Sequence, residues 1–326
     1  MFTNAIRLTG LTALLIVASS LTPGALAQSY PVKPIRVISP WASGGPAEAL
    51  ARVVTNKMSE ALGQPIVIES RAGANGTIGT AFVAKSAPDG YTILLSHLGP
   101  SAIAPALQKD LPYDTLRDFE PVTQVVAGPT LLVVRNDLPV QTMKELIAYA
   151  KAHPGRLSYG SVGVASTTHL AGELMNMLAD IRTVHIPYKG STPILTDIMG
   201  GRVDMAFIGI SGAIQQARAG QVRAIALSTL RRSPNLPDIP AVSETLPGFE
   251  LNSWYGMSVP AGTPRAIVLR LHQEVANALR KPDVVDWMKQ NGLDPVGSTP
   301  DEHALQLRGE LVKWAKIVTE AKVVAN

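Results

Sequence analysis

Residues 35–62 read IRVISPWASGGPAEALARVVTNKMSEAL, and this stretch decides the fold. Ile35–Ile38 has the composition of a short strand, the middle is a turn rich in Ser, Gly and Pro, and residues 46–62 repeat apolar side chains at helical spacing. The order recurs downstream, with a strand predicted at 66–68, a helix at 77–85 and a strand at 91–95. A β-α-β-α-β order predicts a mostly parallel sheet that is flanked by helices.

The middle of the chain continues this alternation. Strands are predicted at 131–134, 157–159, 184–186, 205–208 and 224–227, with helices around 142–152, 168–178, 193–199 and 213–218, and the C-terminal part is mainly helical. At roughly 150 residues per domain, the length suggests two domains. We therefore expect an α/β protein of two lobes. Lobe 1 comprises residues 28–126 and 254–326, and lobe 2 comprises residues 127–253, with crossings near 122–129 and 252–260.

The N-terminus carries the features of an export signal. Arg7 precedes an apolar run over residues 8–21, and Ala25-Leu26-Ala27 has the small-x-small pattern of a cleavage site. This order predicts a signal peptide over residues 1–27 and a periplasmic mature protein; the alternative is a buried N-terminal helix. The run is shorter than the roughly 20 apolar residues that span a bilayer.

Composition excludes several functional classes. The chain has no cysteine, so it has no disulfides, no thiol chemistry and no cysteine-linked lipid anchor. Its formal charge of +4 is spread along the sequence, without a Lys/Arg cluster interleaved with aromatic residues, which argues against nucleic-acid binding. A mild positive charge suits an anionic ligand, although it is weak evidence alone.

The turns that follow predicted strands hold the candidate ligand-binding residues. In open α/β sheets, ligands bind beyond the carboxyl ends of the strands, where backbone N–H groups at helix N-termini favour anions. Such residues also make ordinary turns and N-caps, but several Gly/Ser/Thr turns in one two-lobed chain are expected to converge on one cleft. The candidates in these turns are Trp41, Ser43, Gly44, Gly45, Asn75, Gly76, Ser96, His97, Ser161, Gly163, Ser166, Thr167, Thr168, His169 and Tyr188.

Motifs for catalysis are missing from the sequence. Gly73 to Gly79 has the spacing GxxGxxG rather than the dinucleotide fingerprint GxGxxG, and neither a phosphate-binding GxxxxGK[ST] loop nor a GxSxG elbow is present. The six histidines form no HExxH or other close metal-ligand spacing. His97 and His169 lie in turns from which each can donate a hydrogen bond to a carboxylate. We expect no catalytic residue, no cofactor and no metal.

From about Tyr30 to Val318 the chain resembles the Bug-type periplasmic solute-binding proteins of tripartite tricarboxylate transporters, the TctC family. The resemblance rests on motifs that occur in order. They are YPVKPIR at 30–36, SPWASGGP at 39–46, ESRAGANGTIG at 69–79, APDGYT at 87–92, LPYD at 111–114, DF at 118–119, STTHLAGE at 166–173, VHIPYKG at 184–190, LPGFE at 246–250 and PAGTP at 260–264.

The resemblance implies fold, ligand and partners. It implies a two-lobed periplasmic-binding-protein fold of type II-like topology, with the ligand cleft between lobes that close by hinge motion. It implies capture of a small carboxylate by the first loop and the Ser161–His169 loop, partly through ordered water, and delivery to membrane permease subunits. A periplasmic ligand sensor that reports to a membrane signalling protein, or a periplasmic hydrolase, remains an alternative. We expect a monomer.

The sequence departs from the family pattern at three places. Ile208 stands where many relatives carry an Asp that can face a ligand ammonium group, Trp41 stands where Phe is frequent, and Glu48 stands where Asp is common. Ile208 and Trp41 together predict an aromatic or otherwise partly apolar carboxylate rather than an amino acid. Ile208 therefore joins the candidate ligand-binding residues.

Overall fold

The chain begins with the strand–turn–helix unit that the sequence predicts. The computed structural model describes residues 30–164, 166–233 and 235–320; the predicted signal peptide lies outside them. From Lys33 on, the described residues form one unit. Its strands are β1 (Ile35–Ser39), β2 (Ile66–Ser70), β3 (Thr92–His97), β4 (Phe119–Val134), β5 (Ser158–Ser161), β6 (Val184–Pro187), β7 (Met205–Gly209), β8 (Arg223–Leu227), β9 (Asn252–Pro260) and β10 (Asp294–Pro295).

Helices follow most of these strands. They are α1 (Pro46–Leu62), α2 (Thr77–Ala84), α3 (Ala104–Leu107), α4 (Met143–Ala152), α5 (Thr167–Ala179), α6 (Ser191–Met199), α7 (Ile210–Arg218), α8 (Arg265–Leu279), α9 (Pro282–Gln290) and α10 (Pro300–Glu320), with single turns η2 (Ala74–Gly76), η3 (Gly99–Ile103) and η4 (Val242–Glu244). None of the helices in the described segments combines the length and the apolar character needed to cross a membrane.

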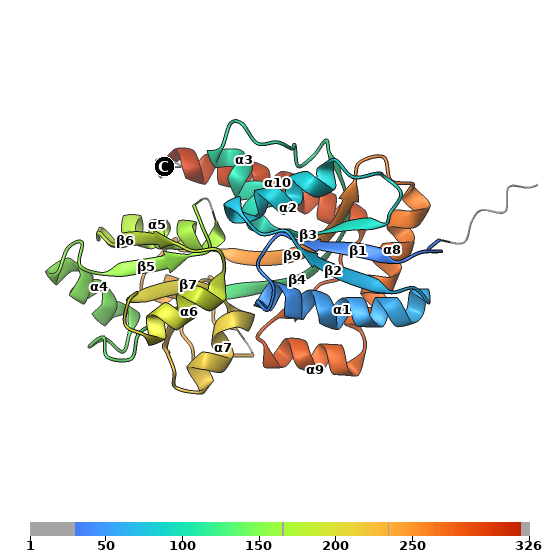
Figure 1. Cartoon of the computed structure of the whole chain (residues 1–326). Helices are drawn as coiled ribbons and strands as arrows, with labels where there is room; N and C mark the ends of the chain where they lie inside the picture. The colour runs from blue at the N-terminus through green and yellow to red at the C-terminus, as the bar shows by residue number, and fades with distance from the viewer. Residues whose placement is uncertain (1–29, 165, 234, 321–326) are drawn as a thin grey trace, which may run out of the picture. The chain divides into compact units, whose positions relative to one another are not determined.

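Two parallel groups of strands are joined by two long antiparallel strands (Figure 1). In the first group β2, β1 and β3 lie side by side in parallel, and in the second β6, β5 and β7 do so. The parallel pairing predicted from the β-α-β order is thus confirmed in both groups. Between the groups, β9 and β4 are antiparallel to each other and to their outer neighbours β3 and β7.

Strand β4 connects the two groups by changing partners along its length. Residues 119–129 pair with β9, whereas residues 130–134 pair with β7, and residues 131–134 also pair with β8. The predicted crossings at 122–129 and 252–260 are therefore neighbouring strands rather than loops. The α/β, two-lobed architecture follows from this arrangement, while the lobe boundaries at 126/127 and 253/254 stay a prediction.

The packing explains why these segments adopt their structures. Helix α1 buries Leu50, Val54 and Met58 on the face that contacts α8 and β2. Burial of each such side chain is worth roughly 1.5–3 kcal/mol. Helix α10 begins with a capping box, in which Thr299 Oγ1 accepts from the Glu302 amide at 3.2 Å and the Glu302 carboxylate accepts from the Thr299 amide. Its Trp314 is 1 % exposed, and the helix contacts β4.

Candidate functional site

A cavity of about 290 Å³ lies where the turns after the parallel strands meet. We call it the main cavity. The strands that precede these turns belong to both parallel groups, as expected for the carboxyl ends of strands in an α/β sheet. Its walls are formed by Trp41, Ala42, Ser43, Gly44, Gly45, Pro46, Ala47, His97, Gly128, Pro129, Thr130, Val162, Thr167, Thr168, Gly190, Ser191, Thr192, Pro193, Gly209, Ile210, Ser211, Ser253, Tyr255 and Leu293.

Four helices present their first residues to this cavity. The starts of α1, α5, α6 and α7 all contribute to its walls. The first N–H groups of a helix have no partner within the helix, and the helix dipole adds positive potential there. In α5 the Ser166 hydroxyl accepts from the His169 amide at 3.1 Å, which leaves the preceding amides of Thr167 and Thr168 for another acceptor. Four such termini around one cavity form a set of donors for an anion.

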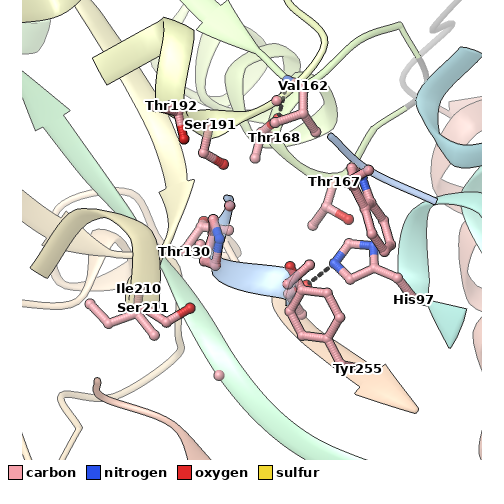
Figure 2. Close-up of a pocket in the computed structure, with 18 of the residues that line it drawn as sticks. His97, Thr130, Val162, Thr167, Thr168, Ser191, Thr192, Ile210, Ser211 and Tyr255 are labelled. Carbon is pink, nitrogen blue, oxygen red and sulfur yellow. Dashed lines mark hydrogen bonds between the residues drawn. The ribbon is translucent and has the colours of Figure 1, made fainter. Parts of the chain in front are cut away.

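Hydroxyl groups add to this donor set (Figure 2). The side chains of Thr167, Ser191, Thr192 and Ser211 surround the same space. The hydroxyls of Thr167 and Thr130 are buried and have no hydrogen-bond partner in the described chain. A buried polar group without a partner costs roughly 1–3 kcal/mol, so a ligand or water that satisfies these hydroxyls gains that energy.

His97 and Ser253 form a buried pair whose protons can be assigned. His97 Nδ1 accepts from the Gly99 amide at 3.1 Å, so the proton of the neutral ring is on Nε2, which lies 2.9 Å from the Ser253 hydroxyl oxygen. Burial lowers the pKa of His97 to about 3, so the ring is neutral at pH 7. Because Ser253 accepts from His97, its own O–H is left to donate, and Ser253 lines the main cavity.

Aromatic rings close one side of the cavity. The Trp41 ring makes edge-to-face contacts with His97 at 5.0 Å and with Tyr255 at 5.7 Å between ring centroids. Tyr255 is also 4.6 Å from His97, and burial raises the pKa of its phenol to about 12. Ile210 and Leu293 add further apolar surface to the cavity. The cavity thus suits an anion that carries an apolar body.

Glu48 orders the first loop without entering the cavity. Its carboxylate accepts from the Gly44 amide at 2.8 Å and pairs with Arg52 one turn later. The Gly44 hydrogen bond, followed by that of Arg52, lowers the pKa of Glu48. The carboxylate is therefore ionised and engaged, and the loop over 43–45 is held at the start of α1.

The structure divides the predicted site residues into three groups. The main cavity brings together Trp41, Ser43, Gly44, Gly45, His97, Thr167 and Thr168. Another cavity, of about 260 Å³, is lined by Asn75, Gly76, Gly163 and Tyr188; we call it the second cavity. It shares Trp41 and Val162 with the main cavity. The remaining candidates, Ser96, Ser161, Ser166, His169 and Ile208, line neither cavity.

The candidates outside the cavities have structural contacts. Ser96 lies near Ser258 on the neighbouring strand, with 3.4 Å between their hydroxyl oxygens, and Ser166 caps α5. Ile208 is fully buried in β7, so the side chain that faces the cavity in this region is Ile210, two residues later. Helix α7 begins at Ile210, directly after β7, so the side chain at the start of the helix lines the cavity while that of Ile208 stays within the sheet.

His169, in the first turn of α5, belongs to a cluster of aromatic side chains with His185 and Tyr159. Its ring centroid is 4.2 Å from that of His185, which in turn lies 4.9 Å from the Tyr159 ring centroid. Burial lowers the pKa of both His169 and His185 to about 4, and for His185 the neighbouring His169 adds to the effect. Ser161 lies 2.6 Å from His185 Nε2. These side chains hold the base of the Ser161–His169 loop.

Several wall residues are missing from the sequence-based set: Thr130, Ser191, Thr192, Ile210, Ser211, Ser253, Tyr255 and Leu293. The rule that ligands bind after strands points to Ser191, Thr192 and Ser211 once α6 and α7 are known to begin there. Thr130, Ser253 and Tyr255 lie within strands and carry no local signal. Among the described residues, no group of three or more His, Cys, Asp or Glu side chains is placed to hold a metal ion.

Comparison with known proteins identifies the relatives of this chain. The family model for TctC, the tripartite tricarboxylate transporter family receptor, matches residues 50–323. The protein BugT of Bordetella pertussis is 34 % identical over 97 % of this chain and 98 % of BugT. A UPF0065 protein from the tcbD-tcbE intergenic region of Pseudomonas sp. (strain P51) is 37 % identical over 96 % of this chain and 93 % of that protein.

Several solved structures are also similar to this chain in sequence and fold. The periplasmic binding protein BugD is 35 % identical with a TM-score of 0.87, covering 90 % of this chain and 99 % of BugD. Rpa4515 of R. palustris, solved with adipate, is 33 % identical with a TM-score of 0.88, covering 90 % and 99 % of the two chains. MatC of Rhodopseudomonas palustris, solved with bound malate, is 34 % identical with a TM-score of 0.84, covering 89 % and 100 %.

Proposed function

This chain belongs to the TctC family of tripartite tricarboxylate transporter receptors, and on that premise we propose that it captures a small carboxylate in the main cavity and delivers it to the membrane permease of such a transporter. As a solute-binding protein it would act in the periplasm, where the predicted export signal would take it. The proposal involves binding without turnover, because the supporting relatives are binding proteins.

One observation carries the proposal. Four helix N-termini meet at a cavity whose described walls hold no Asp, Glu, Lys or Arg. An anion there is stabilised by neutral donors, while a cation meets only positive helix ends. Rpa4515 with adipate and MatC with malate are relatives that bind carboxylates, which supports the same ligand class here. The wall of Trp41, Tyr255 and Ile210 favours a ligand with an apolar body.

A thermal-melt screen tests carboxylate capture. Purified protein from residue 28 on is melted with mono-, di- and tricarboxylates, aromatic acids and amino acids, each acid being paired with its neutral amide. A ligand that binds only the folded protein raises the melting temperature by mass action. At a concentration a hundred times its dissociation constant, it increases the free energy of unfolding by about 2.7 kcal/mol. We expect saturable stabilisation by acids and none by the amides. Equal stabilisation by acid and amide, or none by any acid, would contradict the proposal.

A charge variant links binding to the helix N-termini. Ser191→Asp places a carboxylate at the start of α6 beside the cavity, where an acidic residue suits the helix itself. Repulsion between two carboxylates at about 4 Å in a partly solvated site is worth about 1–4 kcal/mol, so the dissociation constant should rise at least about fivefold. Gln141→Asp adds the same charge before α4, outside both cavities, and should leave binding unchanged.

Transport is tested in cells. Deletion of the gene should abolish uptake of the radiolabelled acid that the screen identifies. Restoring the unaltered gene should recover uptake, and the Ser191→Asp gene should not. Normal uptake in the deletion strain would show that the protein is not required for transport of that acid.

A further inference from the structure

A third cavity borders the main cavity at the starts of α1, α6 and α7. A Cβ added to Gly212 would lie 3.1 Å from Pro46 Cγ, so α7 closely approaches the start of α1 there. The third cavity has a volume of about 290 Å³, and it shares with the main cavity the wall residues Gly44, Gly45, Pro46, Ser191, Thr192 and Ser211. A ligand that fills the main cavity and extends past these shared residues enters the third cavity.

The wall of the third cavity is neutral. Among its described residues there is no Asp, Glu, Lys, Arg or His. Leu195 and Met199 supply apolar surface, and Gln215, Gln216 and Gln221 supply amide groups. An ionised group that enters this space loses hydration without meeting an opposite charge, which is unfavourable. The third cavity therefore suits an uncharged chain that carries a polar group.

Gln216 provides an acceptor that the described chain leaves unused. Its Oε1 is buried and has no hydrogen-bond partner there. In contrast, Gln215 Nε2 donates to the Gln290 carbonyl at 3.3 Å. The Thr196 hydroxyl donates to the Thr192 carbonyl at 3.1 Å. A buried oxygen without a donor is costly, and rotation about the last side-chain bond of Gln216 can turn it toward a ligand N–H or O–H.

The main and third cavities thus differ in the hydrogen-bonding groups they offer. The first amides of α5 and the Ser253 hydroxyl donate into the main cavity. Gln216 offers the third cavity an oxygen that accepts. An ionised carboxylate only accepts hydrogen bonds, whereas a hydroxyl or a primary amide can donate. A molecule that satisfies both cavities has a carboxylate at one end and a neutral donor at the other.

We propose that the third cavity receives the uncharged, hydrogen-donating end of the acid, a hydroxyl or a primary amide that donates to Gln216 Oε1, while the carboxylate lies in the main cavity. This inference rests on the proposed function, and it narrows the ligand class to acids with a neutral polar tail. A second carboxylate gains nothing from Gln216 Oε1, because it has no proton to donate.

Pairs of acids of equal length test the proposal. Dissociation constants are measured by calorimetry for pentanoate, heptanoate and nonanoate, each with the ω-hydroxy acid in which a hydroxyl replaces the terminal methyl group. The quantity compared is the dissociation constant of the methyl acid divided by that of the hydroxy acid. For at least one length, this ratio should be about 2- to 12-fold higher in the wild type than in Gln216→Met, as expected for one neutral hydrogen bond.

Two further variants show which partner donates. Gln216→Glu keeps the acceptor oxygen and loses the amide donor, so the ratio should stay at least as high as in the wild type, even if the new charge weakens both acids. Gln141→Met makes the matched change at an exposed glutamine outside all three cavities and should leave the ratio unchanged. Thermal melts without ligand check that each variant folds.

The outcomes separate this inference from the proposed function. If no acid binds, either here or in the thermal-melt screen, the proposed function is overturned together with the inference. If the screen finds acid ligands but the ratio is the same in the wild type and Gln216→Met at every length, the carboxylate site stands and the tail site is refuted. A ratio that falls in Gln216→Glu as far as in Gln216→Met would also refute it, because the ligand would then accept from Gln216.

Discussion

Removal of the Ser253 hydroxyl should weaken carboxylate binding much more than it changes the fold. His97 Nε2 donates to this hydroxyl at 2.9 Å, so the Ser253 O–H is directed to an acceptor in the main cavity. A hydrogen bond to a charged group contributes about 1.5–3 kcal/mol. Ser253→Ala should therefore raise the dissociation constant by roughly 10- to 150-fold. Ser258→Ala removes a buried hydroxyl of the same strand that lies outside the cavity, and it should leave the dissociation constant unchanged.

Calorimetric titration with the acid that gives the largest melting shift measures this effect. A companion variant, His97→Asn, keeps an acceptor near the Gly99 amide but is too short to reach Ser253, so it should cause a smaller loss. If the pair acts as one unit, the losses of Ser253→Ala and His97→Asn should not add in the double variant. Wild-type affinity in Ser253→Ala, or a loss equal to that of Ser258→Ala, would refute the assignment of Ser253 as a ligand donor.

Three further predictions concern stability and the unpartnered hydroxyls. Burial lowers the pKa of His169 to about 4, whereas the unfolded chain titrates near 6.5; the unfolded state therefore binds more protons, and stability is lost as pH falls below about 6.5, by roughly 2 kcal/mol at pH 5 for this residue. Melting temperatures that stay constant from pH 8 to 5 would contradict this. Gly172→Ala places a Cβ 2.3 Å from Tyr159 Cε2 and should cost about 1–3 kcal/mol by chemical unfolding, unlike Gly309→Ala, which meets open space. Thr167→Val should weaken binding of the acid. It should leave the ligand-free protein at least as stable as the wild type, because it removes a buried hydroxyl that has no hydrogen-bond partner in the described chain. A destabilised ligand-free protein would show that the hydroxyl has a structural role.

The alternating elements could be predicted because each carries its own local signal. Helix α1 begins at Pro46 and ends at Leu62 as its apolar spacing and the following glycine indicate, and α4 is capped by Thr142 as predicted. Strands β4 and β9 were harder to predict, because Gly and Pro within residues 119–130 and 252–260 are typical of loops. Residues 119–129 of β4 pair with β9, more than a hundred residues away in the sequence, so only the tertiary structure makes these segments strands.

The candidate site shows the same division. Thr167 and Thr168 could be identified because a Ser/Thr run before a helix marks an N-terminus that is open to anions. Ser253 could not be identified in this way, since nothing in the local sequence shows which face of β9 is turned to the cavity. The direction in which its hydroxyl donates also depends on His97, which lies in another strand. Asn75 lines the second cavity rather than the main one, and its role as a ligand-binding residue stays a prediction. Sequence turns indicate where ligand groups gather, and packing decides which of them share a space.

The expectation that amino acids are poor ligands now rests on different residues. The sequence argument depended on Ile208, which is buried in β7 and does not line the cavity. The cavity itself supplies a stronger reason, because its described walls combine four helix N-termini with no carboxylate that could pair with an ammonium group. An ammonium group that enters there loses its hydration without gaining an opposite charge, which costs several kcal/mol. We therefore expect the arrangement of α1, α5, α6 and α7 to select against amino acids, and a change of Ile208 to Asp alone should not reverse this selection.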